Sequence, residues 1–183
     1  GELEAVFLVI DPNRNVLDAN DTVGMQAATI RGLEAINRLA EEMHPSEIEI
    51  ARSVDEIERI VDSGKFAASI GIENGLVVGE EIGLIETYFE YGGRYMALPH
   101  DIHVEPFDVE DVSGDDFDGK GLAPLAPSII DEMNRLGMAV DISHLSRTAM
   151  LEAVSLSQAP VIASNSAIRK LRNHSWNLDD DQL

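Results

Sequence analysis

The stretch PSIIDEMNRLGMAVDISHLSRTAMLEAVSL, residues 127–156, decides the fold class of this chain. Its two ends, residues 127–136 and 146–156, carry apolar side chains every three or four positions, which is typical of the buried face of an α-helix. Between them, residues 138–142 are almost continuously apolar, as in a strand that is buried on both faces. A helix, a buried strand and a second helix in succession indicate a parallel α/β fold.

The same alternation extends over the rest of the chain. It predicts further strands at residues 3–10, 66–73, 94–98 and 160–163, and further helices at residues 23–43, 54–62, 80–91 and 167–171. The acidic, glycine-rich stretch 100–121 is expected to be a loop. Each strand is apolar and precedes a helix, so we expect one parallel sheet covered by helices on both faces.

Two architectures fit this pattern: an open, doubly wound sheet, and an arc of a (β/α)8 barrel. A complete barrel needs about 250 residues, whereas this chain has 183. Residue spacing alone therefore leaves both architectures open.

Composition excludes several classes of protein. Thirteen Lys and Arg residues against 34 Asp and Glu residues give a net charge of −21, which repels nucleic acid and anionic membrane surfaces. The absence of cysteine excludes disulfide frameworks, thiolate catalysis and cysteine-based zinc sites. No apolar run approaches the ~20 residues of a membrane span. We expect a soluble protein, and its compartment stays open between the cytoplasm and an exported location.

Polar side chains follow four of the predicted strands, at the point where each strand ends. They are Glu73, His100, His144 and Asn165. In parallel α/β folds the carboxyl ends of the strands build the active site, and a Glu with two His suits Zn²⁺. Asp141 is expected to face inward or to support a neighbouring ligand. Taken singly, each of these residues could instead cap a helix, form an ion pair or be a structural histidine.

Five stretches of the sequence carry a family resemblance: IGIENG (70–75), GGRYMALPH (92–100), GL-P (121–124), IIDEMNRLGMAVDISHLS (129–146) and APVIASNSAIRKLRNHSWN (159–177). Together they resemble the membrane (renal) dipeptidase family of zinc peptidases. The resemblance implies a TIM-type (β/α)8 barrel, of which this chain covers about five β/α units, strands two to six. Residues 1–183 would then form a single partial barrel domain. It also implies two zinc ions, hydrolysis of dipeptides by metal-activated water, and a homodimer.

The resemblance also implies roles for individual residues. Glu73 falls on the glutamate that bridges the two metals, and His144 falls on a zinc ligand. His100 falls on the histidine that contacts the substrate, where it would donate to the developing oxyanion. Two positions depart from the family: Asn165 stands where a second histidine ligates zinc, and Trp176 stands where an arginine binds substrate. Asparagine is a poorer zinc ligand than imidazole, and an indole cannot clamp a carboxylate as a guanidinium does.

These departures leave three hypotheses. The first is a zinc-dependent, dipeptidase-like hydrolase in a truncated or impaired form. The second is a catalytically inactive relative that keeps the fold and acts as a binding or scaffold protein. The third is a hydrolase with an altered substrate, in which Trp176 receives an apolar group in place of a free carboxylate. An open arc of strands also leaves two unpaired sheet edges, so we expect the chain to associate with another chain.

Overall fold

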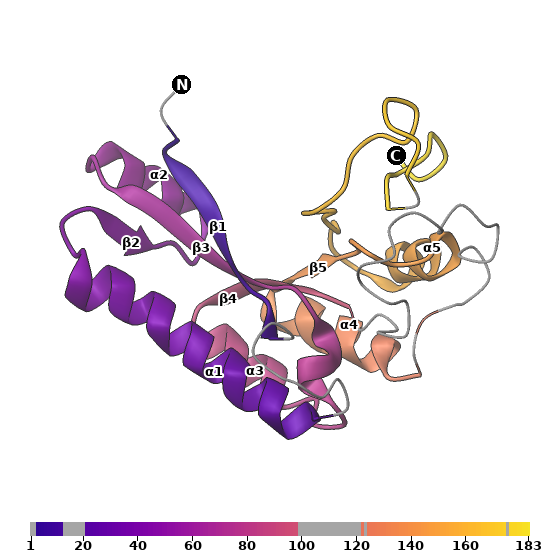
Figure 1. The fold of residues 1–183 in the computed structure, drawn as a ribbon, viewed down its shortest axis with the longest axis horizontal. Helices are drawn as coiled ribbons and strands as arrows, with labels where there is room; N and C mark the ends of the chain where they lie inside the picture. The colour runs from indigo at the N-terminus through magenta and orange to yellow at the C-terminus, as the bar shows by residue number, and fades with distance from the viewer. Residues whose placement is uncertain (1–2, 13–20, 99–121, 123, 175) are drawn as a thin grey trace.

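The computed structural model describes residues 3–12, 21–98, 122, 124–174 and 176–183 (Figure 1). Its helices and strands are, in chain order, β1 (Ala5–Ile10), α1 (Thr22–Arg38), β2 (Ile48–Ile50), α2 (Val54–Asp62), β3 (Phe66–Ile72), α3 (Leu84–Glu90), β4 (Gly93–Ala97), α4 (Ala126–Leu136), β5 (Ala139–Asp141) and α5 (Arg147–Leu156). A π-helical turn, Leu39–Met43, extends α1, and a 3₁₀ turn, Gly75–Val78, follows β3. Among the described residues, no helix is both long and apolar enough to cross a membrane.

All pairings in the sheet are parallel, and the order of the strands follows the chain. β1 pairs with β3, β3 with β4, and β4 with β5, while the short β2 pairs with the first half of β3. Beyond β5, Ile162 forms a single parallel bridge with Asp141. A doubly wound sheet reverses its strand order at a switch point, whereas β1, β3, β4 and β5 follow one another without a reversal and the short β2 lies off this path. The order is that of a (β/α)8 arc, which confirms the barrel-type prediction.

One face of the sheet builds the hydrophobic core. Side chains of β3, β4 and β5 on this face are almost fully buried, and α1, α3 and α4 lie side by side against them (Figure 1). The helices contribute buried side chains that include Leu33, Ile85 and Met133. Burying about a dozen large apolar side chains, at roughly 1.5–3 kcal/mol each, makes this face the main source of stability.

The opposite face carries the polar residues and is only partly covered. Phe7 of β1 pairs with Ser69 of β3, so the two side chains share this face. Phe7 and Val9 are 49% and 47% exposed. The expectation that the strands are buried on both faces is therefore correct for β3 and wrong for β1, because the small apolar cluster of Ala51, Ile60 and Ala67 reaches Ala5 at the start of β1 but leaves Phe7 and Val9 about half exposed.

Two predicted elements near the C-terminus do not form. Residues 160–163 contribute only the bridge of Ile162 to Asp141 instead of a strand. Residues 167–171 form a bridge and turns instead of a helix, because Ile168 pairs with Leu178: the Arg169 amide donates to the Leu178 carbonyl at 2.7 Å, and the Leu178 amide donates to the Ala167 carbonyl at 2.8 Å. The Asn177 side chain supports this arrangement. Its Oδ1 accepts from the Ala167 amide at 3.1 Å, and its Nδ2 donates to the Arg172 carbonyl at 2.8 Å. Leu171, which a helix would have to bury, is 83% exposed.

Other differences concern the lengths of the elements. The three-residue strand β2 is too short to show a pattern, and the sequence prediction missed it. The helix predicted at residues 80–91 is shortened to Leu84–Glu90. Gly79, directly before the predicted helix, has a φ of +56°, which is incompatible with helical geometry at that position. The predicted loop 100–121 lies outside the described residues.

A close contact between β3 and β4 holds the polar face together. The ring of Tyr95, 2% exposed, lies across the backbone of Gly71, where a Cβ atom would approach Tyr95 Cζ to 2.1 Å. The ring also meets Phe7 edge-on, with 4.9 Å between the ring centroids. Only glycine at position 71 leaves room for this tyrosine.

We therefore expect Gly71→Ala to lower the free energy of unfolding by about 2 kcal/mol, because the new methyl group overpacks a buried ring that cannot move aside without breaking its contacts. Urea unfolding followed by circular dichroism measures this. Gly83→Ala is the matched control: position 83 has φ −60° and no heavy atom within 4 Å of the added Cβ. The free energy of unfolding of the control should equal that of the unmodified chain or exceed it by up to about 1 kcal/mol. Equal stability of the two variants would contradict the packing argument.

Candidate active site at the carboxyl ends of the strands

The parallel sheet brings the predicted site residues to one edge. Glu73 directly follows β3, and its amide donates to the carbonyl of Ile10 at 2.9 Å, which continues the pairing of β3 with β1. His144 comes three residues after β5 and Asn165 three residues after the Ile162 bridge. Since all of these strands run in the same direction, their carboxyl ends meet.

Glu73, His144 and Asn165 come together around one imidazole nitrogen. Glu73 Oε1 lies 3.6 Å from His144 Nε2, and Asn165 Nδ2 lies 3.2 Å from the same nitrogen. The His144 side chain is 10% exposed and that of Glu73 is 34% exposed. The histidine is therefore enclosed, while the carboxylate remains open to a ligand.

Trp176 lies against the same histidine. Its ring meets that of His144 nearly perpendicularly, with 4.7 Å between centroids, and that of His174 at 5.3 Å. The structure thus places Trp176 beside the cluster of Glu73, His144 and Asn165. His100, the remaining predicted residue, lies outside the described residues.

The backbone at His144 is unusual. Its φ is +66°, in the left-handed region that non-glycine residues rarely adopt and that costs of order 1 kcal/mol. Such a conformation persists only where neighbouring contacts fix the chain on both sides. The residues that fix it are those around Asp141.

Asp141 faces inward, which was one of the two roles expected for it. It is 2% exposed and pairs with Ala97, two residues beyond Tyr95 on β4. Its carboxylate accepts hydrogen bonds from the amides and hydroxyls of Ser143 and Ser164. The sequence reading missed both serines. The available signal was spacing: Ser143 comes two residues after Asp141, and Ser164 comes two residues after Ile162, which pairs with Asp141. A spacing of two puts these side chains on the same face of the sheet.

Tyr95 joins the same network from β4. Burial raises the pKa of its phenol, the hydrogen bond with Ser164 opposes that rise, and the negative charges of Asp141 and Glu73 add to it. The phenol therefore stays neutral at physiological pH and can act as a hydrogen-bond donor within the network.

The spacing of Glu73 and His144 fits a shared metal ion. Two ligand atoms, each about 2.0–2.1 Å from a tetrahedral Zn²⁺, lie about 3.3–3.4 Å apart, which is close to the 3.6 Å between Glu73 Oε1 and His144 Nε2. An amide flip, which exchanges atoms that look alike, would turn the Asn165 oxygen toward the same point. The described residues contain no group of three or more His, Asp or Glu side chains that could hold an ion, so the described part of the site is incomplete in ligand number.

A cleft of about 880 Å³ adjoins Glu73. It runs along the end of β1 and the small-residue face of α1, and its lining includes Asp11 and Arg31. Asp11 follows β1 just as Glu73 follows β3, and the sequence reading passed over it as part of a turn. The carboxyl edge therefore carries one more acidic group than predicted.

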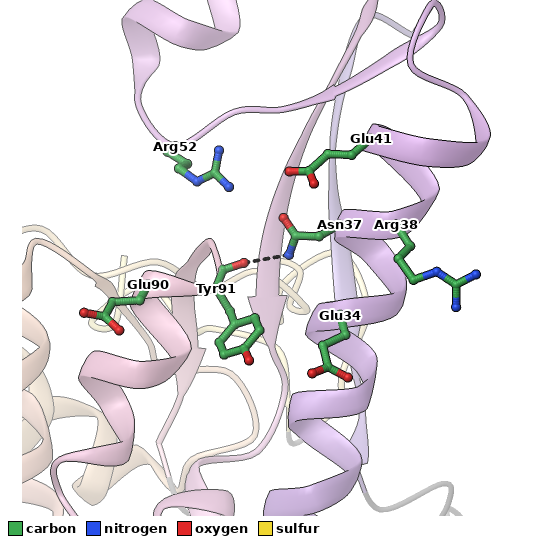
Figure 2. A pocket seen from close by; sticks show the side chains of 7 residues that line it. All are labelled: Glu34, Asn37, Arg38, Glu41, Arg52, Glu90 and Tyr91. Carbon is green, nitrogen blue, oxygen red and sulfur yellow. Dashed lines mark hydrogen bonds between the residues drawn. The ribbon is translucent and has the colours of Figure 1, made fainter.

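A second cavity, of about 360 Å³, lies far from this edge, beside the amino end of β4 (Figure 2). Figure 2 shows the amide of Asn37 pointing to the carbonyl of Tyr91, with 2.8 Å between the atoms. None of the predicted site residues lines this cavity, whose walls are Glu34, Asn37, Arg38, Glu41, Arg52, Glu90 and Tyr91. The candidate active site is therefore the carboxyl edge.

Two curated relatives are similar to this chain in sequence. One is the dipeptidase verJ of Clonostachys rogersoniana, 34% identical over 85% of this chain and 39% of its own length. The other is the dipeptidase tcpJ of Claviceps purpurea, 32% identical over 85% of this chain and 36% of its own length. The chain thus spans less than two fifths of the length of either relative.

A solved structure shares the fold. It is a metallopeptidase from Rhodobacter sphaeroides, liganded with a phosphinate mimic of the dipeptide L-Ala-D-Ala. The two chains superpose with a TM-score of 0.78 at 18% identity, over 98% of this chain and 57% of that one. Over residues 2–183 the sequence matches the membrane dipeptidase family. The chain belongs to this family, peptidase family M19.

Proposed function

We propose that this chain carries part of the active site of a zinc-dependent dipeptidase, as one part of a single barrel domain that includes residues 1–183. The observation that carries the proposal is the convergence of Glu73, His144 and Asn165 at the carboxyl edge, from the ends of β3 and β5 and from the segment after the Ile162 bridge. Active sites of barrel enzymes are built in this way. The dipeptidase names of the curated relatives and the dipeptide mimic held by the Rhodobacter sphaeroides structure support it.

The metal would be held by Glu73 and His144, with the Asn165 amide oxygen as a weaker third ligand. When bound, zinc lowers the pKa of water toward neutrality and polarises a peptide carbonyl. Glu73 is the more exposed of the pair, so its carboxylate can also receive a proton or the amino group of a peptide. His144 is held in place by the ring of Trp176 and the amide of Asn165.

The surroundings of Trp176 favour a hydrolase with an altered substrate as the second candidate. The indole, 38% exposed, stands beside His144 where a substrate would enter. Three cations of the C-terminal part are already paired with acids: Arg147 and Arg169 contact Asp179, and Lys170 contacts Asp180. An indole offers apolar area and a polarisable face but no positive charge. This side of the site suits a substrate with an apolar group better than one with a free carboxylate.

The first test combines metal content with hydrolysis. We expect the purified chain to bind zinc and to release amino acids from a panel of dipeptides, and removal of the metal by a chelator to abolish this reversibly. Glu73→Gln and His144→Ala should each lower kcat/KM by about a hundredfold or more, since several kcal/mol of transition-state stabilisation are lost. Glu58→Gln, at an exposed position of α2, is the matched control.

The outcomes separate the hypotheses. If the chain binds zinc and hydrolyses dipeptide amides or acylated substrates but not free dipeptides, the hypothesis of a hydrolase with an altered substrate is favoured. A folded chain that neither binds zinc nor hydrolyses any substrate would refute the enzyme proposal and leave the binding or scaffold alternative. Light scattering on the same sample tests the homodimer that belongs to this proposal, by showing twice the mass of one chain.

Trp176→Arg tests the substrate preference. An arginine beside His144 can form a charge-assisted, bidentate pair with a carboxylate, so we expect the variant to raise kcat/KM for free dipeptides over dipeptide amides by roughly tenfold, the equivalent of about 1.4 kcal/mol. Leu171→Arg, which adds the same charge at a position that is 83% exposed, should leave the preference unchanged. A preference that does not move in Trp176→Arg would remove Trp176 from the substrate subsite.

A further inference from the structure

A single buried carboxylate joins the end of β5 to the segment that carries Asn165. Asp141 Oδ1 accepts from the Ser143 amide at 3.0 Å, the Ser143 hydroxyl at 2.7 Å and the Ser164 amide at 3.2 Å. Asp141 Oδ2 accepts from the Ser164 hydroxyl at 2.5 Å. A carboxylate this enclosed is costly unless its lone pairs are satisfied, and these donors satisfy it.

Ser143 extends the link to both functional side chains. It is 3% exposed, and its hydroxyl donates to Asp141 while accepting from the amide of Asn165 at 3.0 Å. The next residue along the chain is His144, and Asn165 Nδ2 lies 3.2 Å from His144 Nε2. The Ser143 hydroxyl therefore ties the backbone amide of Asn165 to the residue that directly precedes His144.

Backbone pairing alone does not hold this region. Beyond β5 the sheet continues only through Ile162, which accepts from the amide of Ile142 and donates to the carbonyl of Val140, each at 2.9 Å. After Ile162, the contacts of Ser164 and Asn165 with Asp141 and Ser143 are made by side chains or to side chains. The left-handed φ of +66° at His144 also needs its neighbours fixed.

We propose that Asp141 and Ser143 are positioning residues. Their hydrogen bonds set the distance between His144 and Asn165 and hold the His144 imidazole at its 3.6 Å separation from Glu73. The claim about geometry stands by itself, whereas its consequence for catalysis rests on the proposed function. A network that fixes ligand side chains typically changes metal affinity by 10–100-fold when it is broken.

The test is Ser143→Ala, which removes the hydroxyl that connects Asp141 with the Asn165 amide. Ser155→Ala is the matched control, because Ser155 is exposed and its hydroxyl bonds only within α5, to the carbonyl of Glu152. We expect the imidazole resonances of His144, assigned by their loss in His144→Gln, to shift in Ser143→Ala and not in Ser155→Ala. We also expect the dissociation constant for Zn²⁺ alone, measured by calorimetry, to rise 10–100-fold in Ser143→Ala only.

Further variants separate positioning from stability. Ser143→Thr keeps a hydroxyl and should restore the zinc affinity. If Ser143→Ala does not fold, Asp141→Asn, which keeps the size and one acceptor oxygen, takes its place and should shift the same resonances. Where zinc binds, kcat should fall more than KM rises, as expected for misplaced catalytic groups.

The two proposals fail in different ways. If the unmodified chain binds no zinc and hydrolyses nothing, the proposed function fails, and the His144 resonances still decide the positioning claim. If the His144 resonances and the zinc affinity are the same in Ser143→Ala as in the unmodified chain, the positioning claim is overturned even for an active hydrolase.

Discussion

The contact of the Tyr95 ring with the backbone of Gly71 is the constraint on which the polar face of the sheet depends. Because Gly71 has no Cβ, the ring can lie flat across β3, and its hydroxyl then reaches Ser164 beyond β5. Ser164 in turn donates to Asp141. One missing methyl group on β3 thus allows a continuous set of contacts across β3, β4, β5 and the segment after it.

The two faces of the sheet divide stability and chemistry between them. Residues such as Ile70, Met96 and Val140 point to the helices and form the core, while the residues between them carry hydroxyl and carboxyl groups on the opposite face. A side-chain period of two enforces this separation, so the core can tolerate apolar exchange without moving the site. The site in turn depends on the sheet, because Asp141 lies on β5 itself and pairs with Ile162 beyond it.

The sequence was informative wherever the period of the apolar residues was regular. The parallel sheet, its helices and the meeting of Glu73, His144 and Asn165 could all be predicted, since carboxyl ends of parallel strands must lie together. The serine network could not, because Ser143 and Ser164 look like ordinary turn residues until the register of β5 is known. The helix expected at residues 167–171 failed for a similar reason: Leu178, ten residues away from Ile168, pairs with this segment instead.

Charge bears on both the proposed metal and the proposed choice of substrate. The chain carries a net charge of −21, and its carboxyl edge adds Asp11, Glu73 and Asp141 to the site or its cleft. Three cations of the C-terminal part, Arg147, Arg169 and Lys170, are paired with the acidic run Asp179–Asp181. These carboxylates repel a carboxylate ligand and attract a divalent cation or a protonated amine, and the Arg31 guanidinium, which also lines the cleft, offsets only part of their charge. Under the proposed function, a bound cation would offset part of this negative charge before a peptide arrives, and a substrate whose own negative charge lies away from these carboxylates would meet the least repulsion.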